Sequence, residues 1–203
     1  MDTATMPNVV AHDSTPEDIF GWFDFAEVYD RAIATAPPGS VLVEVGVFLG
    51  KSLVYLAAKA KQANKGLRVY GVDAWRGSAE FDGTVWFNDK PANEVPGQML
   101  MTCYDNIQHH GLADDVTLIV SDSARAASLF ADGSVHMAFI DAAHDEESVA
   151  RDIAAWRPKI AAGGLLAGHD YPLESGFPGV KAAVDMAFGD RVKTTGASWG
   201  VWL

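Results

Sequence analysis

The sequence contains a single cysteine, Cys103, among its 203 residues. One thiol can neither close an internal disulfide nor supply the several thiolates of a zinc–cysteine cluster. Cys103 lies in a segment of helical period, where a lone cysteine usually serves as a small buried apolar residue. Disulfide frameworks and zinc–cysteine sites are therefore excluded, and a cysteine nucleophile is not favoured.

Basic residues are scarce, since 15 Lys and Arg stand against 27 Asp and Glu, giving a formal net charge of −12. Affinity for nucleic-acid phosphates or anionic membranes depends on clustered Lys and Arg, so neither partner is expected. No apolar run reaches the roughly 18 residues of a membrane span. The first residues lack the basic and apolar regions of a secretory signal. We therefore expect a cytoplasmic protein that forms a single domain over 1–203.

Short apolar, β-branched runs alternate with longer segments of helical period along most of the chain. The expected strands are 41–47, 67–75, 116–121, 135–141 and 164–170, with a last strand region at 191–203. The expected helices are 50–66, 98–110, 124–130, 146–160 and 180–188. Repeated strand–helix units predict a parallel sheet with helices on both faces, the doubly wound α/β class.

Two segments do not belong to this alternation. Residues 1–40 are expected to form an N-terminal helical cap, with one or two helices over 15–36. Residues 76–97 are polar and too long for an ordinary connection, so we interpret them as a lid or substrate loop. Both segments are rich in aromatic residues, which could either cover the active site or close the apolar core.

The turn after the first expected strand, in "VLVEVGVFLGKS", carries Glu44, Gly46 and Gly50. Glycines at such a turn allow close approach to a ligand, and the next helix begins with free N–H groups. The spacing E-x-G-x-x-x-G differs from the G-x-G-x-x-G of dinucleotide-binding proteins. A tight turn without a ligand remains an alternative interpretation of this motif alone.

Acidic residues also follow the next two strands. Asp73 ends the second, where a carboxylate can accept hydrogen bonds from both hydroxyls of a ribose. Asp122 and Ser123 follow the third, where they could bond the edge of an adenine. Each could instead be the N-cap of a helix. Acids at three successive strands together favour a nucleoside-containing cofactor.

With these motifs, the chain resembles the class I S-adenosylmethionine-dependent methyltransferases over 41–203. The resemblance implies a Rossmann-like sheet of seven mostly parallel strands and S-adenosylmethionine as cofactor. It also implies that Gly46 and Gly50 bracket the methionine part of the cofactor, with Glu44 nearby. Asp73 would then hold the ribose, and Asp122 with Ser123 would face the adenine.

Two further strands each end in an acid and a histidine, in "FIDAAH" and "GGLLAGHDY". These motifs resemble a subgroup of metal-dependent small-molecule O-methyltransferases that includes sugar O-methyltransferases acting on antibiotic scaffolds. The resemblance implies that Asp141 and Asp170 bind Mg²⁺ or another divalent cation, with His169 as a further ligand. His144 would be the general base that takes the proton of a small-molecule hydroxyl, with Asp141 beside it in the catalytic site.

Two other functions remain open alternatives. An NAD(P)-dependent oxidoreductase could use Asp73 on its ribose, but predicts a G-x-G-x-x-G that the first turn lacks. A non-catalytic S-adenosylmethionine-binding module predicts the loss of Asp141, His144 or Asp170, and all three are present. The acceptor is not specified by the sequence, and a homo-oligomer stays open because many relatives pair through N-terminal helices.

Overall fold

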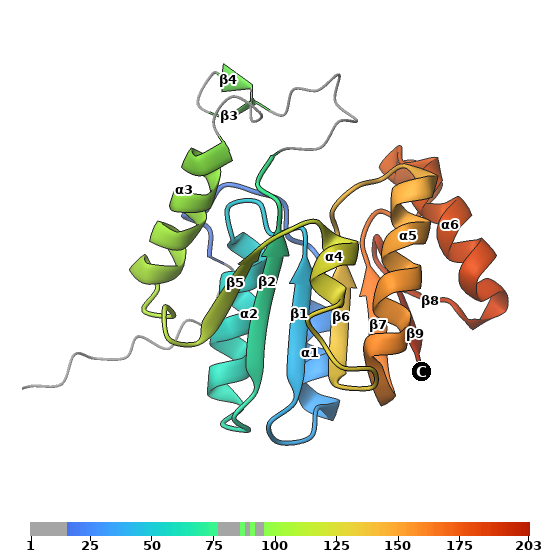
Figure 1. Ribbon diagram of the computed structural model, residues 1–203, viewed down its shortest axis with the longest axis horizontal. Helices are drawn as coiled ribbons and strands as arrows, with labels where there is room; N and C mark the ends of the chain where they lie inside the picture. Colours follow the sequence, from blue (N-terminus) through green and yellow to red (C-terminus); the bar gives the residue numbers. More distant parts are fainter. Residues whose placement is uncertain (1–15, 77–85, 88–89, 92–95) are drawn as a thin grey trace, which may run out of the picture.

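The computed structural model describes residues 16–76, 86–87, 90–91 and 96–203. In this part of the chain, seven strands form one sheet in the order β5-β2-β1-β6-β7-β9-β8, and two short strands form a separate hairpin (Figure 1). The strands of the sheet are β1 (Val41–Val45), β2 (Arg68–Asp73), β5 (Val116–Val120), β6 (Val135–Ile140), β7 (Ile160–Gly168), β8 (Lys193–Thr195) and β9 (Ser198–Trp202). The hairpin strands are β3 (Trp86–Phe87) and β4 (Lys90–Pro91).

The sheet is mostly parallel, which confirms the expected doubly wound α/β class. The strands from β5 to β7 in the sheet order run parallel, whereas β9 is antiparallel to both β7 and β8. The central strands β1 and β6 are buried along their whole length, as expected where helices cover both faces. Because β1 pairs with β2 on one side and β6 on the other, the connections reverse direction there. Ligands of open α/β sheets bind at such a reversal, beyond the carboxyl ends of the strands.

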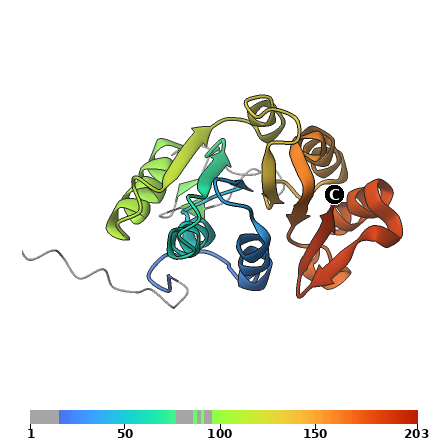
Figure 2. The same cartoon turned by 90° about the horizontal axis from the view of Figure 1, so that it is seen from below.

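Helices pack on both faces of the sheet (Figure 2). They are α1 (Ala26–Thr35), α2 (Lys51–Gln62), α3 (Pro96–His109), α4 (Ser123–Ala127), α5 (Glu146–Trp156) and α6 (Pro178–Phe188). Helices α1 to α3 and helices α4 to α6 each share a separate apolar cluster with one face of the sheet. Cys103 lies in the first cluster with no exposed surface, which confirms it as a buried apolar residue. Among the described residues, no helix has the length and apolar character that crossing a bilayer requires.

Acidic N-caps set where two of the helices begin after their strands. Asp145 accepts a hydrogen bond from the backbone N–H of Ser148 at 2.9 Å and starts α5. Asp122 accepts one from the N–H of Arg125 at 3.2 Å and starts α4. An N-cap of this kind stabilises a helix by about 1 kcal/mol. The residues just before these caps are thereby held at the carboxyl edge of the sheet.

The N-terminal cap contains one helix, α1, within the described residues. Residues 16–25 form turns, bends and irregular chain instead, and Gly21 among them has a φ of +144°, which lies outside the helical range. We call residues 16–25 the N-terminal strap. Residues 1–15 and most of 76–97 lie outside the described residues, so the lid interpretation of 76–97 stays a prediction.

Candidate active site

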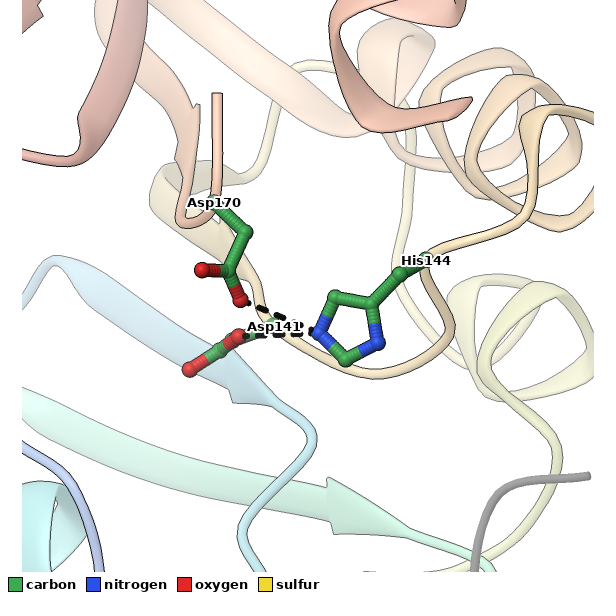
Figure 3. Close-up of side chains that lie close together, drawn as sticks. All are labelled: Asp141, His144 and Asp170. Atoms are coloured by element: carbon green, nitrogen blue, oxygen red, sulfur yellow. Dashed lines mark ion pairs between the residues drawn. The ribbon is translucent and has the colours of Figure 1, made fainter. Parts of the chain in front are cut away.

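Asp141 and Asp170 come together where two neighbouring strands end. Asp141 directly follows β6, and Asp170 lies two residues beyond the end of β7. The two strands are parallel partners, with Ile140 opposite Gly168. With His144, these residues form a group whose potential ligand atoms all lie within 4.8 Å of one another (Figure 3). Two carboxylates and one imidazole fit a divalent cation, with the carboxylate oxygens suited to Mg²⁺ and the nitrogen to Mn²⁺ or Fe²⁺.

The imidazole of His144 is held from two directions. Its Nε2 lies 3.1 Å from Asp170 Oδ2 and 3.9 Å from Asp141 Oδ1. One face of the ring stacks on Phe177, with centroids 4.1 Å apart and planes 24° from parallel. The next residue, Asp145, is the N-cap of α5 and fixes the backbone. The ring is therefore oriented toward the two carboxylates before any ligand binds.

Asp170 adopts a left-handed backbone conformation with φ +58°. Aspartate tolerates this region better than most residues, but it still costs about 1 kcal/mol. The conformation is supported by Ser175, whose hydroxyl donates to the carbonyl oxygen of Asp170 at 2.9 Å. Strain of this kind is concentrated at functional sites, where the surrounding structure holds it.

His169, expected as a further metal ligand, lies beside this group, and its role as a ligand stays a prediction. Its Nε2 lies 2.8 Å from Asp24 Oδ1, and its Nδ1 lies 3.4 Å from Asp170 Oδ2. The ring also packs near Phe25, at 5.0 Å between centroids. Within the described residues, His144 rather than His169 groups with the two carboxylates. His169 Nε2 therefore faces the N-terminal part of the chain, while Asp170 faces His144.

The charges of this cluster shift its pKa values in opposite directions. Burial, reinforced by the charge of Asp170, raises the pKa of Asp141 to about 6 against the opposing effect of both histidines. Burial would also raise the pKa of Asp170, but hydrogen bonds from His144 and His169 hold it well below its usual range. Burial would lower the pKa of His169, yet the neighbouring carboxylates raise it to about 9. The cluster thus holds concentrated negative charge that a cation can offset.

Glu44, the acid of the first turn motif, is buried with only 1 % of its surface exposed. Its two carboxylate oxygens accept hydrogen bonds from the hydroxyls of Tyr29, at 2.7 Å, and Ser52, at 2.8 Å. Burial raises its pKa from about 4.5 to about 8, and these hydrogen bonds only partly oppose the effect. Through these hydrogen bonds Glu44 links α1 and α2 to β1. The expected proximity of Glu44 to the cofactor stays a prediction.

Replacing Glu44 with glutamine should change how stability depends on pH. Between about pH 4.5 and pH 8 the folded protein retains a proton at Glu44 that the unfolded chain releases. The free energy of unfolding contributed by this group therefore falls as the pH rises through that window. The Tm of the unaltered protein, measured from pH 5 to pH 8.5, should fall more steeply than that of Glu44→Gln. Parallel curves would contradict the raised pKa, since other titrating groups are common to both proteins.

Gly46 lies where the first turn approaches β6. Its φ is +88°, and a Cβ built on it would lie 1.9 Å from the carbonyl oxygen of Asp141. Its N–H donates to the carbonyl oxygen of Val72 at 2.9 Å. Gly50, also at φ +88°, is the N-cap of α2. Gly46 is therefore required by the packing of the chain itself, and its contact with a cofactor stays a prediction.

Asp73, the expected ribose-binding acid, organises the same turn. Its Oδ2 accepts hydrogen bonds from the N–H groups of Val47 and Phe48 at 2.8 and 2.9 Å, and its Oδ1 accepts one from Trp75 at 2.7 Å. Burial raises its pKa, an effect that these backbone donors reduce. Asp73 thus fixes the turn after β1 from the end of β2, and its contact with a ribose stays a prediction.

Asp122 and Ser123, the expected adenine-binding pair, lie after β5. Asp122 is the exposed N-cap of α4, and Ser123 accepts a hydrogen bond from Trp156 Nε1 at 3.0 Å. Their contact with an adenine stays a prediction.

The residues that follow the parallel strands form one row along the carboxyl edge, in the sheet order β5-β2-β1-β6-β7. The expected cofactor residues occupy the first three strands of this row, and the acid and histidine cluster occupies the last two.

Asp24 and Phe177 also contact the site, and sequence reasoning did not find them. Asp24 reaches His169 across 145 positions of sequence, and Phe177 comes from the start of α6. Neither belongs to a motif. Only the folded chain brings them to the carboxyl edge.

Comparison with known families decides the class of protein. A family profile described as a methyltransferase domain matches residues 43–171, which is more than half of the chain. The chain belongs to this methyltransferase family. The match runs from β1 to just past Asp170, and it therefore includes the whole row of residues along the carboxyl edge.

Solved structures show that the methyltransferase shares its fold with proteins of low sequence identity. CalS11, described as a calicheamicin methyltransferase and as a TDP-rhamnose 3′-O-methyltransferase, is 18 % identical with a TM-score of 0.64, over 87 % of this chain and 76 % of its own. The O-methyltransferase NovP is 18 % identical with a TM-score of 0.65, over 87 % and 78 %. A candidate rRNA methylase from Clostridium thermocellum is 13 % identical with a TM-score of 0.60, over 90 % and 97 %. The expected class I fold is confirmed, and S-adenosylmethionine is the cofactor that the family supports.

The oxidoreductase alternative receives no support from the methyltransferase structure. Such enzymes commonly use a Tyr-x-x-x-Lys pair, and Tyr55 and Lys59 have this spacing within α2. The hydroxyl of Tyr55, however, donates to Asp30 of α1 at 3.0 Å. The Tyr55 hydroxyl is therefore engaged by a neighbouring helix, α1.

Proposed function

We propose that this methyltransferase transfers the methyl group of S-adenosylmethionine to a hydroxyl oxygen of a small molecule, with the help of Mg²⁺ or another divalent cation. The observation that carries the proposal is the grouping of Asp141, His144 and Asp170 beyond β6 and β7. This grouping lies beside the turn expected to bind the cofactor, because Gly46 packs directly against the backbone of Asp141.

Asp141 and Asp170 would hold the cation through their carboxylate oxygens, with His144 beside them. A cation bound there lowers the pKa of a coordinated hydroxyl and helps to orient it. The chain's contribution is to keep two carboxylates side by side despite their burial and mutual repulsion, which the two nearby imidazoles partly offset.

His144 would act as the general base. In methyl transfer, a lone pair of the acceptor oxygen attacks the methyl carbon while the carbon–sulfur bond breaks and its electron pair stays on sulfur. The hydroxyl proton passes to the imidazole of His144, and S-adenosylhomocysteine leaves. Phe177 and Asp170 hold the ring in place for this transfer, which matters because a positioned base contributes about 10²–10⁴-fold.

A small-molecule acceptor is favoured over RNA by the composition of the chain. The formal net charge of −12 would oppose binding to a polyanion. The similarity to CalS11, described as acting on TDP-rhamnose, supports a sugar hydroxyl, and the similarity to NovP supports O-methylation. The candidate rRNA methylase among the similar structures represents the competing acceptor class.

The proposal predicts that removing the metal abolishes turnover but not cofactor binding. Titration calorimetry should show micromolar binding of S-adenosylmethionine, and none of NADH, with or without EDTA. Turnover is measured as S-adenosylhomocysteine released with a panel of a catechol, a phenol and a methyl glycoside. EDTA should reduce it at least about 10²-fold, and added Mg²⁺ or Mn²⁺ should restore it.

Asp141→Asn should reproduce the effect of EDTA without responding to added metal. Asp114→Asn, an exposed carboxylate in the turn before β5, is the matched control and should behave as the unaltered protein. Turnover that EDTA does not change would rule out the metal site. It would favour a metal-free reaction in which His144, paired with Asp170, is the general base. Binding of NADH in place of S-adenosylmethionine would overturn the proposal as a whole.

A further inference from the structure

The N-terminal strap is attached to the rest of the protein at both of its ends. Near its start, Asp18 Oδ2 lies 3.1 Å from His110 Nε2, just after α3. Near its end, Asp24 Oδ1 lies 2.8 Å from His169 Nε2. Between them, the rings of Phe20 and Trp22 lie 6.2 and 6.4 Å from that of Phe48, in the turn after β1. The strap therefore runs past the expected cofactor turn and ends at the acid and histidine cluster.

A continuous series of contacts leads from Asp24 into the proposed metal site. The Nε2 of His169 lies 2.8 Å from Asp24 Oδ1, and its Nδ1 lies 3.4 Å from Asp170 Oδ2. The same Asp170 oxygen lies 3.1 Å from His144 Nε2. The His169 side chain is only 13 % exposed, so its ring has little room to turn away. Asp24 thus contacts Nε2 of the buried His169 ring. The other nitrogen of that ring, Nδ1, faces Asp170, a candidate metal ligand.

Among the residues that the structure describes, Asp24 makes no other side-chain hydrogen bond or ion pair that would account for its position. It stands just before α1, but the N-cap of that helix is Phe25 and receives no side-chain hydrogen bond. The side chain of Asp24 is 67 % exposed, and an exposed ion pair contributes only about 0–1 kcal/mol to stability. A stability role is therefore small, whereas the geometric effect on His169 is direct.

We propose that Asp24 is a positioning residue for the metal site. It fixes the His169 ring so that Nδ1 faces Asp170, and this contact holds the Asp170 carboxylate where it meets Asp141 and His144. The inference rests on the proposed function, because it assigns to Asp24 an effect on metal affinity. Partners that orient a metal ligand in this way typically change affinity by about 10–100-fold when removed.

The test is a Mn²⁺ titration of the full chain, followed by calorimetry or by the loss of the free Mn²⁺ signal in electron paramagnetic resonance. Asp24→Ala, which removes the acceptor facing His169 Nε2, should weaken Mn²⁺ binding about tenfold, with a Tm within about 2 °C of the unaltered protein. Asp24→Glu, which keeps the carboxylate, should recover most of the affinity. Asp18→Ala is the matched control, because it removes an acid from the same strap without touching His169, and its affinity should be unchanged.

The outcomes separate this inference from the proposed function. Equal Mn²⁺ affinity in the unaltered protein and Asp24→Ala would overturn the positioning role and leave the metal site standing. An equal loss in Asp18→Ala would show that attachment of the strap matters instead of the Asp24–His169 contact, and would also overturn it. If the unaltered protein binds Mn²⁺ no better than Asp170→Asn, the metal site itself fails, and the role of Asp24 fails with it.

Discussion

Replacing His144 with alanine is expected to lower the turnover of the methyltransferase about 10²–10⁴-fold, the range typical for loss of a positioned general base. The Kd for S-adenosylmethionine should not change, because His144 lies against Asp170 and Phe177, whereas the cofactor is expected at the turn after β1. Both quantities are measured on the same protein, turnover as S-adenosylhomocysteine released at saturating cofactor and Kd by calorimetry. A loss confined to turnover assigns His144 to the chemical step.

His109→Ala is the matched control for this experiment. His109 lies at the end of α3 with 77 % of its side chain exposed, so its removal should leave both quantities unchanged. Full turnover in His144→Ala would remove the base from the mechanism. Turnover that returns in excess Mn²⁺ would identify His144 as a metal ligand, since a missing base cannot be supplied by more metal.

Gly46→Ala is expected to be among the most destabilising single substitutions in the chain. Its Cβ would lie 1.9 Å from the carbonyl oxygen of Asp141, so the turn after β1 must move away from β6. The left-handed backbone costs about 1–2 kcal/mol for a residue with a side chain, and overpacking adds about 1–3 kcal/mol. Urea unfolding should therefore show a loss of about 2–5 kcal/mol, or no folded protein.

Gly39→Ala separates these two causes. Gly39 also has a left-handed backbone, with φ +77°, but no atom lies within 4 Å of a Cβ built there. The free energy of unfolding of Gly39→Ala should fall by the backbone contribution alone, about 1–2 kcal/mol. If both variants lose the same free energy of unfolding, close packing against Asp141 does not explain the requirement for glycine at position 46.

Local signals in the sequence were sufficient for the fold. The apolar runs of β1 and β6 are buried along their lengths, and this pattern alone favours a parallel sheet covered on both faces. Asp122 and Asp145 each follow a strand and cap the next helix. These are interactions within a few residues, which sequence patterns record directly.

Contacts between distant segments could not be predicted in this way. Tyr29 and Ser52 donate to Glu44 from two helices, and Asp24 reaches His169 from the start of the chain. The respective roles of His144 and His169 also depend on the side to which each ring turns, and no spacing rule specifies that. The sequence therefore predicted an acid and histidine cluster but not its internal arrangement.

Residues selected as ligand-binding by motif also have structural reasons to be there. Gly46 is required by the backbone of Asp141, and Asp73 holds the turn after β1 through its backbone N–H groups. The same residues can serve both purposes, because a turn that must approach a ligand must first be held in shape. A substitution at either position therefore needs a stability measurement beside any binding measurement.

The position of β7 in the sheet has a consequence for biosynthesis. This strand lies between β6 and β9, so a growing chain completes β1, β2, β5 and β6 while one edge of β6 still has no partner. Strand β6 is apolar and fully buried in the finished protein, and such an open edge readily pairs with another chain. The same late strand delivers His169 and Asp170, 145 positions after the Asp24 that His169 contacts. Release of the chain before Ile160 thus leaves both an unpaired strand edge and an incomplete acid and histidine cluster, and translation of the same segment corrects both defects.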